Sequence, residues 1–202
     1  MSLRQEYRSR FEQVLQPLAV ALEGHFREHL GGEKRVDRVQ ARAKGIDRFV
    51  AKAEKLDEDG KSKYEHPLVQ IQDQVAARIT VFYLEDIVRI SQIVERYFRQ
   101  AEAKMVVPDR KWEFGYFGKH YILLVPSDVV IESWPKEKTP AVFELQIKTL
   151  FQHAWSEAEH DLGYKPGEAP LEPDDERMLA FTSAQAWGAD RIFDELSKKY
   201  QR

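Results

Sequence analysis

The chain has 202 residues, of which 43% are hydrophobic, and it carries a net charge of −3 with no cysteine. This composition supplies enough apolar material for one domain with a sizeable core and excludes a disordered protein, while the absence of cysteine excludes disulfides and thiolate metal sites. The small negative charge excludes nucleic-acid binding through overall charge, so a site for a polyanion must come from local clustering. No apolar run approaches the ~20 residues of a membrane span, and the N-terminus has no signal-peptide pattern, so we expect a soluble cytoplasmic protein without a membrane partner.

Apolar periodicity predicts a long helix near each end of the chain. Apolar residues recur every three or four positions from Phe11 to Phe26, which predicts an amphipathic helix over residues 3–30 that ends at Gly31-Gly32. A second helical region is predicted over residues 176–200. Between these regions, the sequence predicts helices over residues 46–56, 87–100 and 150–162, and strands over residues 77–84, 121–125 and 141–149. Strands interspersed with helices favour an α+β or α/β domain with one mixed sheet.

The basic segment over residues 34–55 is a candidate anion site. On a helix beginning near Lys44, the side chains of Lys44, Arg48 and Lys52 fall along one ridge at i, i+4 and i+8. Like charges at this spacing repel each other by a few tenths of a kcal/mol per pair, and the repulsion is relieved if the ridge faces a polyanion such as a triphosphate. The alternative is a solvated charged face, because no glycine-rich phosphate loop accompanies the segment.

The strand that begins FELQIK presents a row of polar side chains. Alternation places Glu144, Gln146 and Lys148 on one face and apolar residues on the other. This polar face is either a solvated face of the sheet or the floor of a cleft in which Glu144 serves as a general base or metal ligand. On the pattern alone, the two alternatives are equally good.

The helix that follows raises the question of a zinc site. His153, Glu157 and His160 lie at i, i+4 and i+7, so that one helix face carries three possible zinc ligands. The same spacing is typical of any polar surface helix, and no zinc-enzyme motif accompanies it, so we disfavour the zinc site. The apolar residues from Phe151 to Leu162 are expected to form the packing face of this helix.

Two further features are compatible with a nucleotide site. Asp73 lies just before the strand over residues 77–84 and could join Glu144 in a Mg²⁺ site of oxygen ligands. Tyr116 and His120 lie on a glycine-containing turn before the next strand. Tyr116 can stack on a nucleobase, although an aromatic residue that covers the edge of the sheet is the commoner arrangement.

Four blocks of sequence, in the same order, resemble motifs of a known family. The block ARAKGIDRFVAKAEK resembles R-x-K-x-x-x-S with its later lysine, DQVAARI resembles D-x-x-G-x-R-I, and GYFGKH resembles G-Y-x-S-x-H. The block ELQIKTLFQHAWSEAEHDLGYK resembles E-x-Q-I-R-T followed by a helix that ends in E-H-x-x-x-Y-K. These are motifs of the (p)ppGpp synthetase domain of the RelA/SpoT family, and the chain is most similar to its single-domain small alarmone synthetases.

The resemblance covers residues 35–165 approximately and implies a fold and an activity. The implied fold is one nucleotidyltransferase-like α+β domain over residues 1–202, with a mixed sheet of about five strands flanked by helices and with helical extensions over residues 3–30 and 176–200. The implied activity is the Mg²⁺-dependent transfer of pyrophosphate from ATP to the 3′-hydroxyl of GDP or GTP, which yields AMP and (p)ppGpp.

The resemblance also implies roles for individual residues. By analogy, Arg42 and Arg78 sandwich the adenine of ATP, Lys44 and Lys52 hold its phosphates, and Arg48 adds a positive charge. Asp73 and Glu144 bind Mg²⁺, and Glu144 is also the base for the 3′-hydroxyl. Tyr116 stacks on the acceptor base, and His120, Gln146, Lys148 and His153 surround the acceptor.

Five positions depart from the family pattern and leave the acceptor open. The chain has Arg48 and Gly118 where the family has Ser, Ala76 where it has Gly, Lys148 where it has Arg, and His153 where it often has Asn. The alternatives are therefore a toxin-type relative that pyrophosphorylates tRNA or adenine nucleotides, and a catalytically silent nucleotide-binding module. The terminal helices either pack on the domain or form the interface of a homodimer or tetramer.

Overall fold

The computed structural model describes residues 1–108, 113–115, 117–163 and 171–200. Within these residues, five strands form one sheet in the order β1-β2-β5-β4-β3. The strands are β1 (Val36–Ala43), β2 (Val75–Val81), β3 (Gln100–Val106), β4 (Gly118–Leu124) and β5 (Val142–Thr149). Strands β2 and β5 are parallel and every other neighbouring pair is antiparallel, so the sheet is mixed and the α+β fold class is confirmed.

The structure contains the two long helical regions that apolar periodicity predicts near the ends of the chain. In chain order the helices are α1 (Leu3–Arg10), a π-helical turn (Phe11–Leu15), α2 (Gln16–His29), α3 (Ile46–Ala53), α4 (Pro67–Gln70), α5 (Leu84–Tyr97), α6 (Leu150–Gly163) and α7 (Pro173–Tyr200). Two 3₁₀ turns occupy residues 72–74 and 136–138. The first three helical segments follow one another without a break, as predicted for residues 3–30. None of the helices described is both long and apolar enough to span a membrane.

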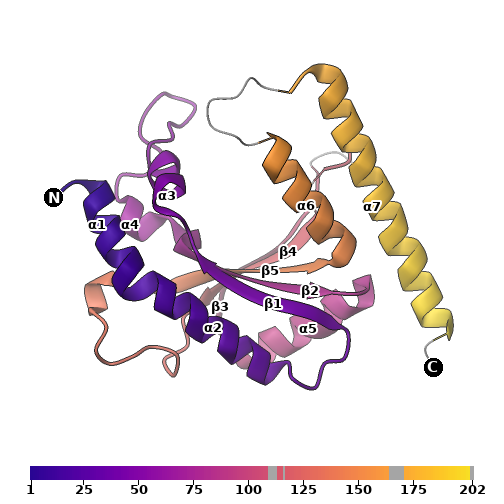
Figure 1. Cartoon of the computed structure of the whole chain (residues 1–202), viewed down its shortest axis with the longest axis horizontal. Coiled ribbons are helices and arrows are strands. Elements are labelled where there is room, and N and C mark those ends of the chain that lie inside the picture. Colours follow the sequence, from indigo (N-terminus) through magenta and orange to yellow (C-terminus); the bar gives the residue numbers. More distant parts are fainter. Residues whose placement is uncertain (109–112, 116, 164–170, 201–202) are drawn as a thin grey trace.

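The sheet separates the hydrophobic core from a polar face. Figure 1 shows α2 and α5 on one side of the sheet and α6 on the other, with α7 outermost beside α6. Along β5, Phe143, Leu145 and Ile147 are fully buried, and the ring of Phe143 contacts Phe26 of α2. The alternation predicted for this strand is therefore confirmed, and the side chain of Glu144 belongs to the opposite, polar face.

Strands β1 and β3 are missing from the elements predicted along the chain, although the resemblance implied about five strands. Both are edge strands, and half of the side chains of β1 and all but one of β3 are exposed, so neither has the apolar pattern of a central strand. The helix predicted over residues 46–56 does begin at Ile46, but the predicted helical ridge that starts at Lys44 is wrong. Strand β1 pairs with β2 as far as Ala43 opposite Val75, and α3 begins only at Ile46, so Lys44 lies in the intervening turn.

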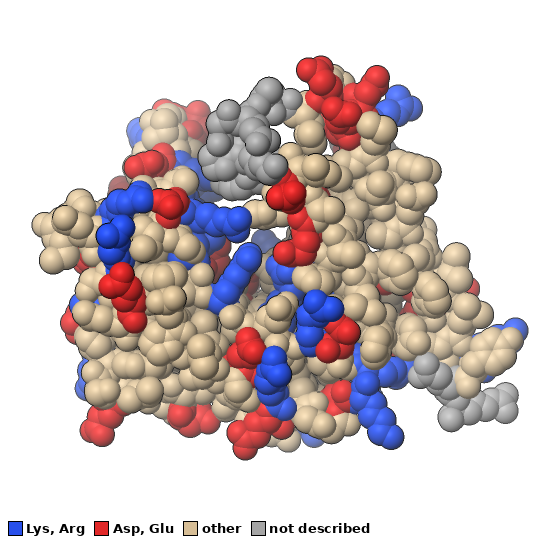
Figure 2. Space-filling model, viewed as in Figure 1, with Lys and Arg blue, Asp and Glu red and all other residues tan. Residues whose placement is uncertain are grey.

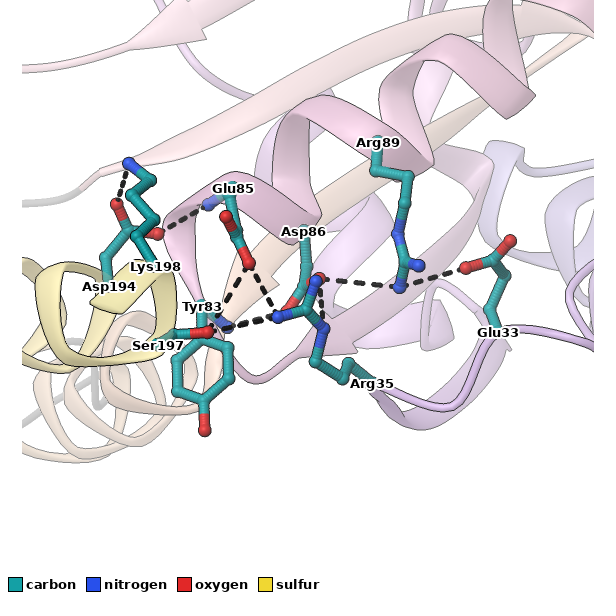
Figure 3. Close-up of polar contacts among 9 residues, drawn as sticks. All are labelled: Glu33, Arg35, Tyr83, Glu85, Asp86, Arg89, Asp194, Ser197 and Lys198. Atoms are coloured by element: carbon teal, nitrogen blue, oxygen red, sulfur yellow. Dashed lines mark hydrogen bonds and ion pairs between the residues drawn. The ribbon is translucent and has the colours of Figure 1, made fainter. Parts of the chain in front are cut away.

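Helix α7 is attached partly through polar contacts, which Figure 3 shows for its C-terminal part, and partly through the stacking of Phe193 on Phe151 of α6. The backbone N–H of Glu85, at the start of α5, donates to Asp194 Oδ1 at 2.8 Å. Arg35 donates to Ser197 Oγ at 3.1 Å and pairs with the fully buried Asp86 at 2.9 Å. These contacts join the segment before β1, the first turn of α5 and the last turns of α7. Many apolar side chains of α7 consequently remain exposed, among them Phe181, Ile192 and Tyr200.

Candidate active site

A cavity of about 790 Å³ lies over the polar face of the sheet, with walls from β1, β2, β5, α3 and α6. Figure 2 shows Lys and Arg side chains gathered around a hollow between α3 and α6. The cations that line this larger cavity are Arg38, Arg42, Lys44, Arg48 and Arg78. An excess of positive charge in a partly enclosed space favours an anionic ligand of nucleotide size.

A second cavity of about 460 Å³ adjoins the first along β3 and β4. Lys52, Lys104 and His120 contribute to its lining. Asp73 and Glu144 line both cavities, so the two carboxylates stand where the cavities meet. Two ligands that occupied the two cavities would therefore approach each other at these carboxylates.

Asp73 is held by two lysines. The 3₁₀ turn before β2 places its carboxylate beside α3 and the β1–α3 turn, where Lys44 Nζ lies 2.8 Å from Oδ2 and Lys52 Nζ lies 3.0 Å from Oδ1. Burial acts to raise the pKa of Asp73, but the two ammonium groups outweigh burial, and the pKa lies below its ordinary value. Asp73 is therefore an ionised carboxylate at neutral pH.

Glu144 is paired with a histidine on the adjacent strand. His120 Nδ1–H donates to Glu144 Oε1 at 2.8 Å, from β4 to β5. Burial acts to raise the pKa of Glu144, but the hydrogen bond and charge of His120 outweigh it, and the net pKa is lowered. The charge of Asp73 also acts on Glu144, so two neighbouring anionic groups face this part of the site.

Arg78 connects the sheet to α6. Its Nη1 donates to His153 Nδ1 at 3.0 Å and also pairs with Glu157. Because a guanidinium can only donate, the His153 ring accepts at Nδ1 and carries its proton on Nε2. Burial and the charge of Arg78 lower the pKa of His153. On β1, Gln40 is paired with Arg78 of β2, and Arg42 lies two residues after Gln40. The side chains of Arg42 and Arg78 therefore project from the same face of the sheet.

Most of the predicted site residues lie around these two cavities. Arg42, Lys44, Arg48, Arg78, Gln146 and His153 line the larger cavity, Lys52 and His120 line the smaller one, and Asp73 and Glu144 line both. Tyr116 lies outside the described residues. The structure thus brings the predicted cations, carboxylates and imidazoles into one region, although Lys52, Gln146 and His153 do not line the cavity that their predicted roles suggest.

Lys148 is placed differently from the prediction. It is only 1% exposed, lies beneath α6, and is not among the residues that line the cavities. Its Nζ donates to Ser156 Oγ at 2.9 Å. Burial, with the charge of Arg78, lowers the pKa of Lys148 to about 7. In this structure Lys148 supports the junction between β5 and α6 and lines neither of the two cavities.

The sequence did not identify several residues of the site. Arg38 and Gln40 of β1 line the larger cavity, and the alternation of Arg38, Gln40 and Arg42 would have indicated this shared face if the segment had been treated as a strand. Glu157 was considered only as a zinc ligand, whereas it pairs with Arg78. Among the residues the structure describes, no three His, Asp or Glu side chains are grouped as a metal site.

Comparison with known proteins identifies the family. Residues 41–169 match the family model for the region found in RelA/SpoT proteins. The chain belongs to the RelA/SpoT family. A relative is GTP pyrophosphokinase YjbM from Bacillus subtilis (strain 168), which is 24% identical over 193 residues, or 93% of this chain and 84% of that protein.

Solved structures of this family have the same fold. Small alarmone synthetase 1 from Bacillus subtilis, bound to its product pppGpp, superimposes with a TM-score of 0.73 at 23% identity, and the match covers 98% of each chain. A GTP pyrophosphokinase family protein from Streptococcus pneumoniae has a TM-score of 0.74 at 22% identity, with 100% of this chain and 96% of that chain covered. Three positions at which this chain departs from the RelA/SpoT pattern, Arg48, Ala76 and His153, line its larger cavity.

Proposed function

We propose that the chain is a pyrophosphokinase that transfers pyrophosphate from ATP to the 3′-hydroxyl of GDP or GTP, with AMP and (p)ppGpp as products. The observation that carries this proposal is the position of Asp73 and Glu144 at the meeting of two cavities. Family membership supports it, as do the relatives whose names describe a GTP pyrophosphokinase and synthetases bound to pppGpp or to AMPCPP.

ATP would occupy the larger cavity. The guanidinium groups of Arg42 and Arg78, which reach one face of the sheet, suit the flat adenine ring. Lys44 and Arg48 would bind the phosphates, together with Lys52 at the boundary of the smaller cavity. Charge-assisted contacts of this kind hold the triphosphate and neutralise its charge.

The carboxylates fit a magnesium ion. Mg²⁺ prefers hard oxygen ligands and usually takes one or two carboxylates, with water and phosphate oxygens completing its shell. Asp73 and Glu144 are both ionised and adjacent, so we propose that they hold Mg²⁺. When bound, the ion would neutralise charge on the phosphates of the substrate.

The acceptor would approach Glu144 through the smaller cavity. Glu144 would accept the proton of the 3′-hydroxyl, and the N–H of His120 would fix the orientation of this carboxylate. Because the pKa of Glu144 is lowered, the carboxylate is a weak base, and positioning of the hydroxyl contributes more than proton abstraction. We keep Tyr116 as a proposed contact to the acceptor. Gln146 and His153 line the larger cavity, so they would contact only a part of the acceptor that extends past Glu144. Lys148 would act only through its support of α6.

The acceptor can be identified by incubation with ATP labelled in its β-phosphate, Mg²⁺ and, in turn, GDP, GTP, ATP or tRNA. Label in ppGpp or pppGpp is the expected result. Label transferred to the 3′-hydroxyl of an adenine nucleotide or of tRNA would show that the acceptor is not a guanosine nucleotide and that the chain is a toxin-type relative. Binding of ATP without release of AMP, whatever the acceptor, would show a silent nucleotide-binding module.

A variant of Glu144 tests the catalytic role. Glu144→Gln keeps the size of the side chain but removes the charge that would bind Mg²⁺ and the base that would accept the proton. We expect pyrophosphate transfer to fall by roughly a hundredfold or more, while a non-hydrolysable ATP analogue still binds. Glu132→Gln, at an exposed position that does not line the cavities, is the matched control and should retain full activity. Full activity of Glu144→Gln would refute the proposed role.

We further propose that the protein acts in the cytoplasm, where its nucleotide substrates are found, and that it forms a homodimer or tetramer. The support for self-association is the row of exposed apolar side chains on α7, which includes Phe181 and Ile192.

A further inference from the structure

The hydroxyl of Tyr7, in α1, reaches the main chain of the β1–α3 turn. Tyr7 is fully buried, and its hydroxyl donates to the carbonyl oxygen of Lys44 at 2.8 Å. Its ring stacks on Phe49 of α3, with the ring centroids 3.6 Å apart and the planes 2° from parallel. Helix α1 lies outside residues 41–169, the part that matches the family model. A residue of the N-terminal extension is therefore in direct contact with the turn that carries a proposed phosphate ligand.

The main chain of Lys44 is held from two sides. Its carbonyl accepts from Tyr7, and its N–H donates to the carbonyl oxygen of Gln74 at 2.8 Å. Gln74 follows Asp73 directly and is itself fixed, because its side-chain amide donates to Leu68 and Ile71 carbonyls at 2.9 and 2.8 Å. The backbone from which the Lys44 side chain starts is thus set relative to Asp73, whose carboxylate its ammonium group meets at 2.8 Å.

The environment of Tyr7 keeps its hydroxyl in the role of a donor. Burial, together with the negative charge of Asp73, raises the pKa of Tyr7 well above its ordinary value, so the phenol stays protonated. A buried hydroxyl without a partner would be costly, and the Lys44 carbonyl supplies that partner. If Tyr7 served only to fill the core against Phe49, a phenylalanine would do as well.

We propose that Tyr7 is a positioning residue of the ATP site, which holds the main chain of Lys44 so that its ammonium group faces Asp73 and the phosphates. This inference rests on the proposed function of Lys44 as a phosphate ligand. Under this inference α1 is a part of the site. The hydrogen bond of Tyr7 connects α1 to Lys44 in the β1–α3 turn, and the stacking of Tyr7 on Phe49 connects α1 to helix α3.

The variant Tyr7→Phe separates these two contributions, since it keeps the stacked ring and removes the hydroxyl. We expect the Kd of a non-hydrolysable ATP analogue and the KM for ATP to rise roughly three- to tenfold, the equivalent of one lost hydrogen bond, with the KM for the acceptor unchanged. Thr139→Val is the matched control. It removes a half-buried hydroxyl that donates to the Pro135 carbonyl at 3.1 Å, away from the cavities, and should leave ATP affinity unchanged.

A double-mutant cycle with Lys44→Met shows whether Tyr7 acts through Lys44. The Lys44→Met variant retains the main-chain carbonyl that accepts from Tyr7 but has no charge for a phosphate, so Tyr7→Phe should cause less than about a 1.5-fold further loss of ATP affinity in this background. Equal losses in both backgrounds, or unchanged affinity in the single variant, would overturn the inference.

The outcomes also separate this inference from the proposed function. A wild-type protein that binds the ATP analogue but transfers no pyrophosphate would refute the reaction, while the binding cycle still decides the role of Tyr7. A wild-type protein that does not bind the analogue would overturn both.

Discussion

Glu157 is one of four acidic residues, with Glu23, Asp73 and Glu144, that line the larger cavity beside five Lys and Arg side chains. Glu157 lies on α6, and its carboxylate pairs with Arg78 of β2. The side chain of Glu157 is about half exposed, while that of Arg78 is largely buried. Burial acts to raise the pKa of Glu157, but Arg78 outweighs it, so the pKa is lowered and Glu157 is ionised at neutral pH. A negative charge at this position opposes a triphosphate in the same cavity.

We therefore predict that Glu157→Gln binds ATP more tightly than the wild-type protein. The amide oxygen of Gln can still accept from Arg78, so the guanidinium keeps its orientation while the repulsive charge is removed. The Kd measured by calorimetry at low salt should fall by about two- to fivefold, and the difference should shrink as salt is added. Glu159→Gln on the same helix, which does not line the cavity, is the control. Weaker binding by Glu157→Gln would mean that the full charge is needed to orient Arg78.

At the scale of elements, helix α7 is fixed to the end of β5 through a buried carboxyl. Asp190 is 2% exposed, and its Oδ2 accepts from Thr149 Oγ1 at 2.8 Å. Burial, with a contribution from the charge of Asp194, raises the pKa of Asp190 to about 6. The folded protein therefore holds this proton up to about pH 6, whereas the unfolded chain releases it near the ordinary value of 3.8.

This raised pKa gives the stability of the protein a pH dependence. Between about pH 4 and pH 6 the folded state binds more protons than the unfolded state, so the contribution of Asp190 to stability is present below pH 4 and is lost as the pH rises through 6. Asp190→Asn is neutral throughout. We expect it to be more stable than wild type by about 1–3 kcal/mol at pH 7.5, with the advantage shrinking towards pH 4 in urea unfolding. Asp175→Asn, exposed in the first turn of α7, should show no such trend. A variant that is less stable than wild type at pH 7.5, and by more than at pH 4, would instead mean that Thr149 requires an ionised carboxylate.

The elements that the sequence predicted well are those whose buried face is apolar. Alternation along β5 and helical periodicity in α2 both reflect burial against the core, so both were predicted correctly. Strand β1 was not, because an edge strand that faces a cationic cavity carries charges in place of apolar residues. The packing face predicted for α6 is confirmed in part, because Phe151 and Trp155 contact α7, whereas Leu162, expected to pack, is exposed. Buried polar side chains such as Gln152 and Asp190 also lie at this junction, and apolar periodicity did not predict them.

For the candidate site, the sequence predicted which residues take part but not all of the contacts between them. The family motifs identified residue types at fixed spacing, and these do gather around the two cavities. The contacts of Glu157 and Tyr7 were not predictable, because they depend on how α6 and α1 lie against the sheet. The resemblance implied that Lys148 contacts the acceptor, and alternation placed it on the polar face of its strand, but α6 covers the end of that strand.

At the scale of the whole molecule, α7 presents apolar side chains that remain exposed among the residues the structure describes. Phe181 and Ile192, about three turns apart on the same side of the helix, are 64% and 60% exposed. The polar contacts of Asp190 and Asp194 with the domain occupy other positions of α7, so these apolar side chains are not needed to dock it. Large apolar side chains that lie exposed on one side of a helix are typical of an interface between proteins.

We predict that α7 joins copies of the chain into a dimer or tetramer, and that charge placed on this surface yields a monomer. The double variant Phe181→Glu/Ile192→Glu puts carboxylates where apolar side chains would be buried between copies, and desolvation of these charges opposes association. Light scattering coupled to size exclusion should give an oligomer for the wild type and a monomer for the variant, at equal concentration. Val20→Glu, at a 75% exposed position on α2, is the control and should leave the assembly intact. A monomeric wild type, or an assembly that Val20→Glu dissociates and the double variant does not, would exclude α7 as the interface.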